Sequence, residues 1–582
     1  MNALWKAKTA DGRYQNPILF ADYSDPDVIR VGSDYFMVAS SFTYLPGVPV
    51  LHSTNLVDWE RIGYCVKELP FERYNRPAHG AGTWAPSIRW HDGTFYVFIP
   101  MPDEGIFVTT AKDPWGEWTP LHCIKEAKGW IDPCPLWDED GKAYMVFAYA
   151  KSRCGIKHKL SVCEISLDAR RILSEPRLVY DGTQTNPTLE GPKFYKRNGW
   201  YYLFAPAGGV ETGWQTVLRS RDVYGPYEYR IVLHEGGSGI NGPHQGGWVE
   251  DTEGKDWFVH FQDAGAYGRV LHLQPMCWNR DWPFMGTEQN GDGIGEPVEE
   301  WELPPVANEK EKTPKPRTLR EGNVLGGDDE FASEELSLAW QWQANPREEW
   351  YSTAKRPGWL RLYTLNNPAR EQNLLWYMGN VCTQLLQAPE FTATALLEGG
   401  FAENGDMAGM GILGHLYTWL ALEKTPAGQR LALYRGDVRV IQAEGEAEES
   451  LLWETPVENK RVWLRLSLET RAEVQGEQKE PAASAVLGQP MDLQLSRQKE
   501  AKSAAIGLSR REILTGGIGE HAFYHYSYSL DGETYLEIPG SFPLKKATWT
   551  GGKFFLAARN RENVSSQGYG EFDYVRFDAG RR

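Results

Sequence analysis

The sequence predicts an all-β protein in which an N-terminal five-bladed β-propeller precedes a C-terminal β-sandwich. Three observations support this prediction. Residues 1–305 contain a repeat with a period of about 55 residues, and five predicted hairpins follow the same period. The second half instead contains strands in which apolar and polar residues alternate strictly.

The repeat is marked by four aspartates. Most of them are followed within a few residues by proline, glycine or an aromatic residue. Successive members lie 55, 55 and 54 residues apart: Asp58, Asp113, Asp168 and Asp222. A constant spacing of this kind indicates one supersecondary unit that is used repeatedly.

Between these aspartates lies a second recurring pattern, an apolar strand, a turn with Gly or Asp, and a strongly aromatic strand. Such turn chemistry between alternating strands predicts β-hairpins. The five hairpins are expected at residues 28–40, 87–99, 135–147, 193–205 and 247–261. Five units of roughly four strands each, with almost no helical periodicity between them, predict a five-bladed propeller.

Residues 306–323 are rich in proline and charge and are expected to be a linker. The β-sandwich is then predicted over residues 324–582. Its strands place Val462, Leu464, Leu466 and Leu468 on one face, and Tyr524, Tyr526, Tyr528 and Leu530 on another. Residues 470–516 are too polar for a core and long for a hairpin connection, so we expect a weakly ordered insertion there.

Composition excludes several classes of partner. Lys and Arg number 61 against 78 Asp and Glu, which gives a formal net charge of −17 and disfavours nucleic acid and anionic membranes. The first residues lack a signal-peptide pattern and no apolar run approaches membrane-spanning length, so a cytoplasmic location is expected. The 7 cysteines include no CxxC pair, which argues against a disulfide scaffold or a zinc site.

The innermost strand of each propeller blade lines the central channel, so the residue just before it is expected to face the axis. Reading this position in the five hairpins gives Asp25, Ala85, Asp132, Glu190 and His244. A single Asp before Pro usually starts a turn. Three acids at equivalent positions favour function instead, because gathering like charges is costly.

Glycoside hydrolysis needs such a set. One carboxyl group must be protonated to assist the leaving oxygen, and another must be ionised to activate water or attack the anomeric carbon. Phe42 and Trp84 both flank blade entries, where their rings could stack on a sugar.

At these residues the chain resembles glycoside hydrolase family 43, whose larger members join a five-bladed propeller to a concanavalin-like β-sandwich. The matching motifs are YSDPD at 23–27, WIDP at 130–133 and LEGP at 189–192. The resemblance implies that Asp25 is the general base, Asp132 the residue that modulates the acid, and Glu190 the general acid. Asp27 is interpreted as structural. Residues 268–278 resemble the subgroup of β-xylosidases and α-L-arabinofuranosidases, which implies that Arg269 contacts substrate.

The sequence suggests two possible calcium sites. His244 could be a buried structural histidine, a proton shuttle or a metal ligand. The resemblance favours the metal ligand, with His244 binding a hydrated calcium ion in the propeller channel. A second, structural calcium is considered in the sandwich, where Asp328, Glu330 and Asp573 lie on terminal strands, although a solvated edge explains them nearly as well. No organic cofactor is expected.

The leading hypothesis is an inverting exo-glycosidase that releases terminal β-D-xylosyl or α-L-arabinofuranosyl residues from hemicellulose oligosaccharides. The first alternative is an endo-arabinanase-like enzyme. A retaining fructan hydrolase is disfavoured, because the Asn-Asp-Pro-Asn and Glu-Cys signatures are missing. A non-catalytic carbohydrate-binding propeller is the second alternative. A homo-oligomer is left open, and the choice between xylose and arabinofuranose cannot be made from the sequence.

Overall fold

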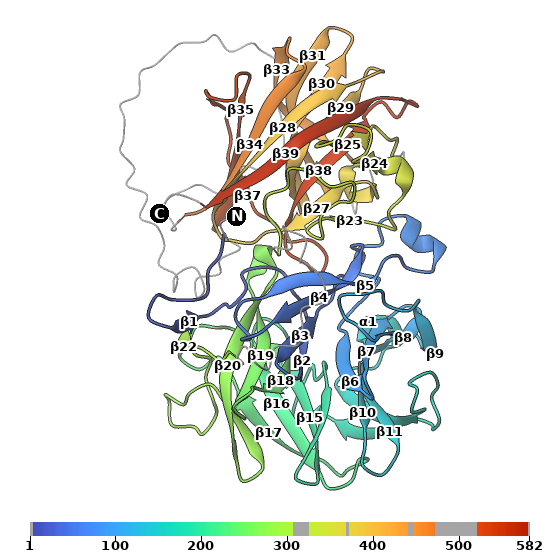
Figure 1. The fold of residues 1–582 in the computed structure, drawn as a ribbon, viewed down its shortest axis with the longest axis vertical. Coiled ribbons are helices and arrows are strands. Elements are labelled where there is room, and N and C mark those ends of the chain that lie inside the picture. The colour runs from blue at the N-terminus through green and yellow to red at the C-terminus, as the bar shows by residue number, and fades with distance from the viewer. Residues whose placement is uncertain (1–3, 307–324, 368–371, 440–446, 472–520, 580–582) are drawn as a thin grey trace.

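The computed structural model of the chain describes residues 4–306, 325–367, 372–439, 447–471 and 521–579. A ring of small antiparallel sheets forms the N-terminal half, and two larger sheets form the C-terminal half above it (Figure 1). The predicted linker, apart from Val306, and nearly all of the predicted insertion at 470–516 lie outside the described residues. The exact limits of the linker therefore stay a prediction.

The propeller has five four-stranded sheets, each with its strands in chain order. Blade 1 contains β2 (Asp27–Val31), β3 (Asp34–Val38), β4 (Gly47–Ser53) and β5 (Glu60–Val66). Blade 2 contains β6 (Ser87–His91), β7 (Thr94–Met101), β8 (Gly105–Ala111) and β9 (His122–Glu126). Blade 3 contains β10 (Trp130–Trp137), β11 (Ala143–Tyr149), β12 (Lys159–Ile165) and β13 (Arg177–Asp181). Blade 4 contains β14 (Lys193–Arg197), β15 (Trp200–Ala207), β16 (Trp214–Ser220) and β17 (Glu228–Leu233). Blade 5 contains β18 (His244–Glu250), β19 (Asp256–Asp263), β20 (Arg269–Asn279) and β21 (Trp282–Met285).

All five predicted hairpins are confirmed, as the first two strands of the five blades. Their turns explain why the sequence folds this way locally. Asp92 and Gly93, between β6 and β7, have φ of 46° and 68°, and Asn198 and Gly199, between β14 and β15, have φ of 51° and 70°. Two successive residues with positive φ form the turn that matches the twist of a tight hairpin.

The repeated aspartates lie in the turn between the third and fourth strands of a blade. Asp113, Asp168 and Asp222 each accept a hydrogen bond from the backbone N–H two residues later. In blade 1 this place is taken by Asn55, whose Oδ1 accepts from the N–H groups of Val57 and Asp58. The spacing of about 55 residues in the sequence therefore reflects the recurrence of this turn once in each of the first four blades.

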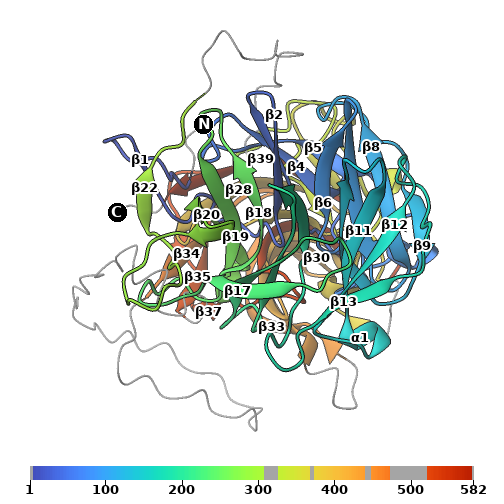
Figure 2. The same ribbon diagram turned by 90° about the horizontal axis from the view of Figure 1, so that it is seen from below.

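The ring is closed by the N-terminal segment. The strand β1 (Arg13–Gln15) pairs with β22 (Glu300–Glu302), at the end of the propeller sequence. Residues 18–23 then run beside β20, where the N–H groups of Ile18 and Tyr23 donate to Leu271 and Arg269. Seen from below, the blades are arranged around a centre (Figure 2).

The C-terminal domain is a sandwich of a seven-stranded and an eight-stranded sheet. The first sheet has the order β23 (Gln341–Trp342), β27 (Cys382–Leu385), β38 (Lys553–Asn560), β29 (Asp406–Leu413), β30 (Leu416–Thr425), β31 (Gly428–Asp437), β33 (Ser450–Val457). The second has the order β24 (Tyr351–Ser352), β25 (Leu360–Tyr363), β39 (Tyr569–Ala579), β28 (Phe391–Gly400), β34 (Arg461–Thr470), β35 (Ala522–Ser529), β36 (Leu536–Glu537), with β37 (Phe542–Pro543) beside β35. A short parallel pair consists of β26 (Gln372–Asn373) and β32 (Ala447–Glu448).

The alternation predicted in β34 and β35 is confirmed, because Val462, Leu464 and Leu466 are buried and the tyrosines of β35 face the core. Leu530 is an exception, since it follows the end of β35 and is 40% exposed. Helices are few and short in the described residues: η1 (Glu72–Asn75), α1 (Lys151–Cys154), η2 (Gly265–Tyr267), η4 (Glu348–Trp350) and η5 (Leu375–Tyr377). No helix among them has the length and apolar character needed to cross a membrane.

The two domains are packed against one another. Phe20 and Tyr267 of the propeller belong to the same apolar cluster as the sandwich interior. Leu45 in the propeller and Trp342 in β23 exchange both backbone hydrogen bonds, at 2.9 and 2.6 Å. The loop between β37 and β38 makes a separate contact with the propeller, in which the N–H of Gly552 donates to the carbonyl of Ala266.

Candidate active site

The side chains predicted at the axis lie at the start of the innermost strands, on unusual backbone. Asp25 and Asp132 have φ of 57° and 55°, a region that residues other than glycine rarely occupy. Strain of this kind persists where the surroundings enforce it, often at functional sites. The matching residues of blades 4 and 5, which also have positive φ, are Gly191 (59°) and Gln245 (37°).

The prediction that all five residues share one register is therefore wrong in detail. Glu190 and His244 lie one residue before the position held by Asp25 and Asp132. In β18 a bulge falls between His244 and Gly246, and in β10 a bulge falls between Ile131 and Cys134, around Asp132. The convergence of the acids is nevertheless present, because the charges of Glu190 and Asp25 both raise the pKa of Asp132.

Asp25 is 5% exposed and is held by three donors from three segments. Its Oδ2 accepts from Ser24 Oγ at 2.9 Å and from Ser40 Oγ at 2.6 Å. Its Oδ1 accepts from Arg269 Nη1 at 3.1 Å. A carboxylate has about four acceptor positions. The contacts leave one free position on Oδ1, which is what a base needs to bind a water molecule.

Asp27, the competing acid in the same motif, is fully buried in a structural ion pair. Its Oδ2 accepts from Arg89 Nη1 at 2.7 Å and from the N–H of Ile88 at 2.9 Å. These contacts join blade 1 to blade 2, as expected for a structural residue.

Asp132 is 2% exposed and accepts the N–H of Gly191 at 2.7 Å. Burial, and after it the charge of Glu190, raise the pKa of Asp132 to about 8, although the Gly191 N–H and Lys193 act in the opposite direction. Asp132 and Glu190 thus form a pair of neighbouring carboxyl groups, in which burial and the charge of Glu190 oppose the ionisation of Asp132.

Glu190 is the more accessible member of the pair, with 26% of its side chain exposed. Its Oε1 lies 3.1 Å from Nε2 of His244, whose ring is fully buried. The contact fixes one oxygen of Glu190 and leaves the other available to a ligand. His244 therefore lies beside the candidate acid Glu190. This position agrees with the prediction from the sequence that both residues face the propeller axis.

Arg269 begins β20 and sits over the ring of Phe261, with its guanidinium carbon 4.9 Å from the ring centroid. It also donates to Ser24 Oγ. Only 13% of its side chain is exposed. The structure thus places Arg269 against Asp25, in a largely buried position.

Phe42 and Trp84 are brought together by a bridge between two loops, in which Phe42 and Thr83 exchange backbone hydrogen bonds at 2.9 and 3.0 Å. Their rings meet edge to face with centroids 6.2 Å apart. Phe42 is 4% exposed, so it supports Trp84 more than it offers a free face. Trp84 is half-buried and its Nε1 has no partner.

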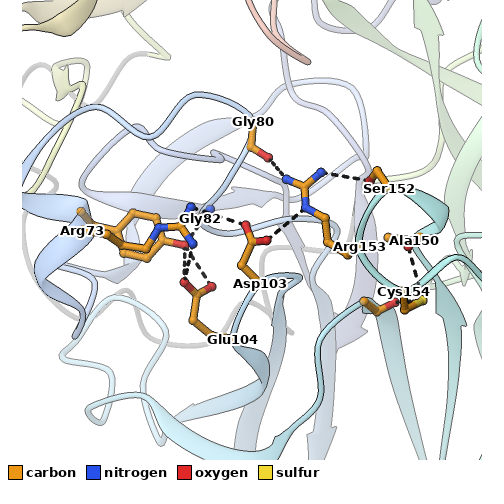
Figure 3. A network of polar contacts seen from close by, with 11 residues as sticks. Arg73, Gly80, Gly82, Asp103, Glu104, Ala150, Ser152, Arg153 and Cys154 are labelled. Atoms are coloured by element: carbon orange, nitrogen blue, oxygen red, sulfur yellow. Dashed lines mark hydrogen bonds and ion pairs between the residues drawn. The ribbon is translucent and has the colours of Figure 1, made fainter.

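Two neighbours of Trp84 could not be expected from the sequence. Arg153 of α1 lies over the indole, 5.1 Å from its centroid, and donates to the carbonyl of Gly80 at 2.8 Å. It also pairs with Asp103 at 3.2 Å, so three loops are joined (Figure 3). Trp549, from the sandwich loop between β37 and β38, contacts Trp84 with centroids 6.1 Å apart.

No sequence signal joins Trp549 to Trp84, because they belong to different domains. Trp549 has φ of 65° and is 51% exposed, which is unusual for so large an apolar side chain. Gly551, two residues later, donates its N–H to Asp22 at 2.9 Å. The sandwich therefore contributes an aromatic residue to the rim of the propeller site.

The residues around His244 allow a limited test of the expected channel calcium. Nδ1 of His244 is buried without a partner, so one ligand position is open. Calcium usually takes six to eight oxygen ligands. Across the described ranges, no three His, Cys, Asp or Glu side chains form a metal-binding group. The residues fit only a hydrated ion with His244 as its one side-chain ligand, and this calcium stays a prediction.

The edge considered for a second calcium has other partners. Both carboxylate oxygens of Glu330 accept from Arg576, at 2.7 and 2.9 Å. Asp328 accepts from the N–H of Phe577 at 2.7 Å. With an arginine already neutralising Glu330, these residues do not fit a calcium site, and Asp573 has no carboxylate cluster to join.

Comparison with known proteins agrees with this geometry. The family model described as glycosyl hydrolases family 43 matches residues 14–283, and the model described as beta xylosidase C-terminal Concanavalin A-like domain matches residues 328–484. A putative beta-xylosidase of Xylanibacter ruminicola is 40% identical over 442 residues, which are 74% of this chain and 77% of that protein.

Other relatives agree. A non-reducing end alpha-L-arabinofuranosidase of Bacteroides ovatus is 30% identical over 390 residues, 62% of this chain and 67% of that protein. The crystal structure of xylan beta-1,4-xylosidase from Bacillus Halodurans C-125 shares the fold, with a TM-score of 0.75, 21% identity and coverage of 97% of this chain and 99% of that one. The chain belongs to glycosyl hydrolase family 43, with a concanavalin A-like C-terminal domain.

Proposed function

We propose that this glycoside hydrolase is an inverting exo-glycosidase that releases terminal β-D-xylosyl or α-L-arabinofuranosyl units from short hemicellulose oligosaccharides. The observation that carries the proposal is the set of three converging acids, in which one acid is paired with an arginine and the other two lie close together. Asp25 faces Arg269. Asp132 and Glu190 form the pair.

The proposed steps follow from these contacts. Asp25 binds a water molecule at its free acceptor position, removes a proton from it and directs the oxygen to the anomeric carbon. Glu190 gives its proton to the leaving oxygen as the glycosidic bond breaks. Asp132 lies beside Glu190 and modulates the acid from there. Arg269 orients Asp25 and lies where a sugar hydroxyl could accept from it.

The exo character is supported by the rim. An endo enzyme needs a groove that is open on both sides of the cleaved bond. Trp549 from the sandwich stands against Trp84 on one side, which restricts the path of a long chain. Incubation with linear arabinan tests this point, since single sugars are expected as the first products and long internal fragments would favour the endo-arabinanase alternative.

Two measurements test the proposal itself. Hydrolysis of 4-nitrophenyl β-D-xylopyranoside and 4-nitrophenyl α-L-arabinofuranoside would establish the preferred sugar, and both sugars are expected to be cleaved. Proton NMR of the first product formed would establish the stereochemistry. An anomer of inverted configuration is expected, and a retained configuration would overturn the assignment of Asp25 as a base.

Three further expectations stay proposals. The chain is expected to work in the cytoplasm on imported oligosaccharides, which fractionation of cells can test. Calcium at His244 would supply a fixed positive charge below the sugar, and metal analysis of purified protein before and after chelation would detect it. Sedimentation would show whether the chain is a homo-oligomer.

A further inference from the structure

Arg269 is held at both ends by four consecutive residues of the chain. Its backbone N–H donates to Oδ1 of Asp22 at 2.9 Å, and its carbonyl accepts from the N–H of Tyr23 at 3.1 Å. Its guanidinium donates to Ser24 and to Asp25, the candidate base. This short segment therefore fixes both the backbone and the side chain of the arginine that faces the base.

The second carboxylate oxygen of Asp22 contacts the other domain. Oδ2 accepts from the N–H of Gly551 at 2.9 Å, and Asp22 is only 8% exposed. Gly551 follows the turn that carries Trp549, which is closed by a hydrogen bond of 2.9 Å from the N–H of Ala547 to the carbonyl of Thr550. One buried carboxylate thus holds a backbone N–H beside the base and another beside the sandwich tryptophan.

Two glycines allow the segments to approach one another at Asp22. A Cβ at Gly268 would lie 2.3 Å from Cγ of Asp22, and a Cβ at Gly551 would lie 2.3 Å from the carbonyl carbon of Tyr267. Both distances are too short for real atoms, so a side chain at either position would push the segments apart. The two domains therefore meet closely around this carboxylate.

The contacts of Asp22 need a carboxylate and not an amide. Each of its oxygens accepts one N–H, whereas asparagine has one acceptor oxygen and an NH₂ group that only donates. Hydrogen bonds to an ionised acceptor are also about twice as strong as those to a neutral one. A buried cation lies nearby, since burial lowers the pKa of Lys553 to about 8 while the charge of Asp22 acts in the opposite direction.

We propose that Asp22 is a positioning residue that couples the sandwich loop carrying Trp549 to the orientation of the general base. It acts on one side through Arg269, which orients Asp25, and on the other side through Gly551, which fixes the loop at the rim. Binding of a sugar against Trp549 and correct placement of the base then depend on the same carboxylate. The roles of Asp25 and Trp549 in this coupling rest on the proposed function.

Asp22→Asn in the full chain tests the coupling, because it keeps the volume of the side chain and removes its charge and one acceptor oxygen. On whichever nitrophenyl glycoside the parent cleaves faster, kcat should fall about tenfold and KM should rise about threefold, as the loss of one hydrogen bond and the weakening of the other predict. Unchanged kcat and KM would overturn the proposal.

Asp251→Asn is the matched control. Asp251 is 1% exposed and accepts from three N–H groups that follow β18. It makes no contact with Arg269 or with the sandwich loop in these hydrogen bonds. Its substitution should lower the melting temperature and leave kcat and KM unchanged.

Two double-mutant cycles separate coupling from a general loss of stability. With Trp549→Ala already present, Asp22→Asn should still lower kcat but should no longer raise KM. With Arg269→Ala already present, Asp22→Asn should lower kcat less than about twofold, because the residue through which it acts is gone. A residue that only supports the fold would change kcat and KM by the same factors in every background, so additive effects in either cycle would overturn the proposal.

Amide hydrogen exchange tests the contacts without relying on catalysis. Asp22→Ala removes both acceptor oxygens, so exchange should become about fivefold faster or more in the peptides that contain Gly551 and in those that contain Arg269. Asp251→Asn should change neither. If the parent cleaves no nitrophenyl glycoside but exchange rises in both peptides, the proposed function is wrong and the link through Asp22 stands. If the parent is active and exchange rises in only one peptide or in neither, the function stands and the coupling is wrong.

Discussion

Two carboxylate sites, one in each domain, differ in their partners. In the sandwich, Glu571 is 4% exposed and accepts from both Arg356 and Arg361 at 2.7 Å. At the propeller axis, Asp132 and Glu190 have no Lys or Arg within ion-pair distance among the described residues, and the charge of Glu190 opposes the ionisation of Asp132. Buried charge that is paired serves the fold, whereas buried charge left unpaired costs stability and is kept where chemistry needs it.

The largest expected effect separates these two kinds of carboxylate. Asp25→Asn should lower kcat about 10³-fold or more, because the amide cannot take a proton from water. Glu571→Gln is the control in the sandwich. It should leave kcat unchanged and lower the melting temperature, since Arg356 and Arg361 lose their partner. Steady-state assays with a nitrophenyl glycoside and thermal melts would check both, and parental kcat in Asp25→Asn would reject the base assignment.

The second prediction distinguishes acid from base at the axis. Glu190→Ala should lose about 10²-fold or more on xylobiose, whose leaving group needs a proton. A dinitrophenyl glycoside has a leaving group that departs without a proton. Glu190→Ala should therefore hydrolyse this substrate at a rate much closer to that of the parent. The same substrate should not rescue Asp25→Asn. If the pattern of rescue were exchanged, the two roles would have to be exchanged as well.

Asp132→Asn tests the role of Asp132 beside Glu190. The substitution removes the negative charge that Asp132 develops beside Glu190 as the pH approaches 8, so the alkaline limb of the pH profile should move to lower pH and kcat should fall about tenfold. The comparison is between the parent and the variant from pH 5 to 9. An alkaline limb that stays in place would show that Asp132 does not govern the proton.

Trp549→Ala tests whether the sandwich contributes to binding. Loss of its contact with Trp84 should raise KM about fivefold with a smaller change in kcat. Trp90→Ala is the matched control, because Trp90 is similarly exposed, at 49%, but lies on β6 of the propeller without contacting Trp84. Equal KM values for the two variants would remove the sandwich from the binding site.

The smallest expected effect concerns stability. The folded chain holds the proton of Asp132 up to about pH 8, whereas the unfolded chain releases it near the ordinary value of 3.8. Folded protein therefore binds more protons between these values, and the free energy of unfolding falls as pH rises through them. Asp132→Asn should remove this loss and stabilise the protein at pH 8 by about 1–3 kcal/mol. Melts at pH 5.5 and pH 8 would measure it, with the larger gain expected at pH 8.

Much of the architecture could be read from the sequence because it depends on local rules. Turn residues such as Asn198 and Gly199 define hairpins, and alternation in β34 defines a buried face. The period of the blades then implies a common axis, so residues as distant as Asp25 and Glu190 could be expected to meet. Local pattern also suggested the motif around Asp132.

Only the tertiary structure decided the contacts that no local pattern encodes. The backbone angles of Gly191 and Gln245 show that Glu190 and His244 are offset by one residue from the position of Asp25 and Asp132. Trp549 reaches Trp84 because two separately folded domains pack together. The raised pKa of Asp132 likewise arises from burial and from charges brought close by folding, since electrostatic energy depends on distance in space and not on distance along the chain.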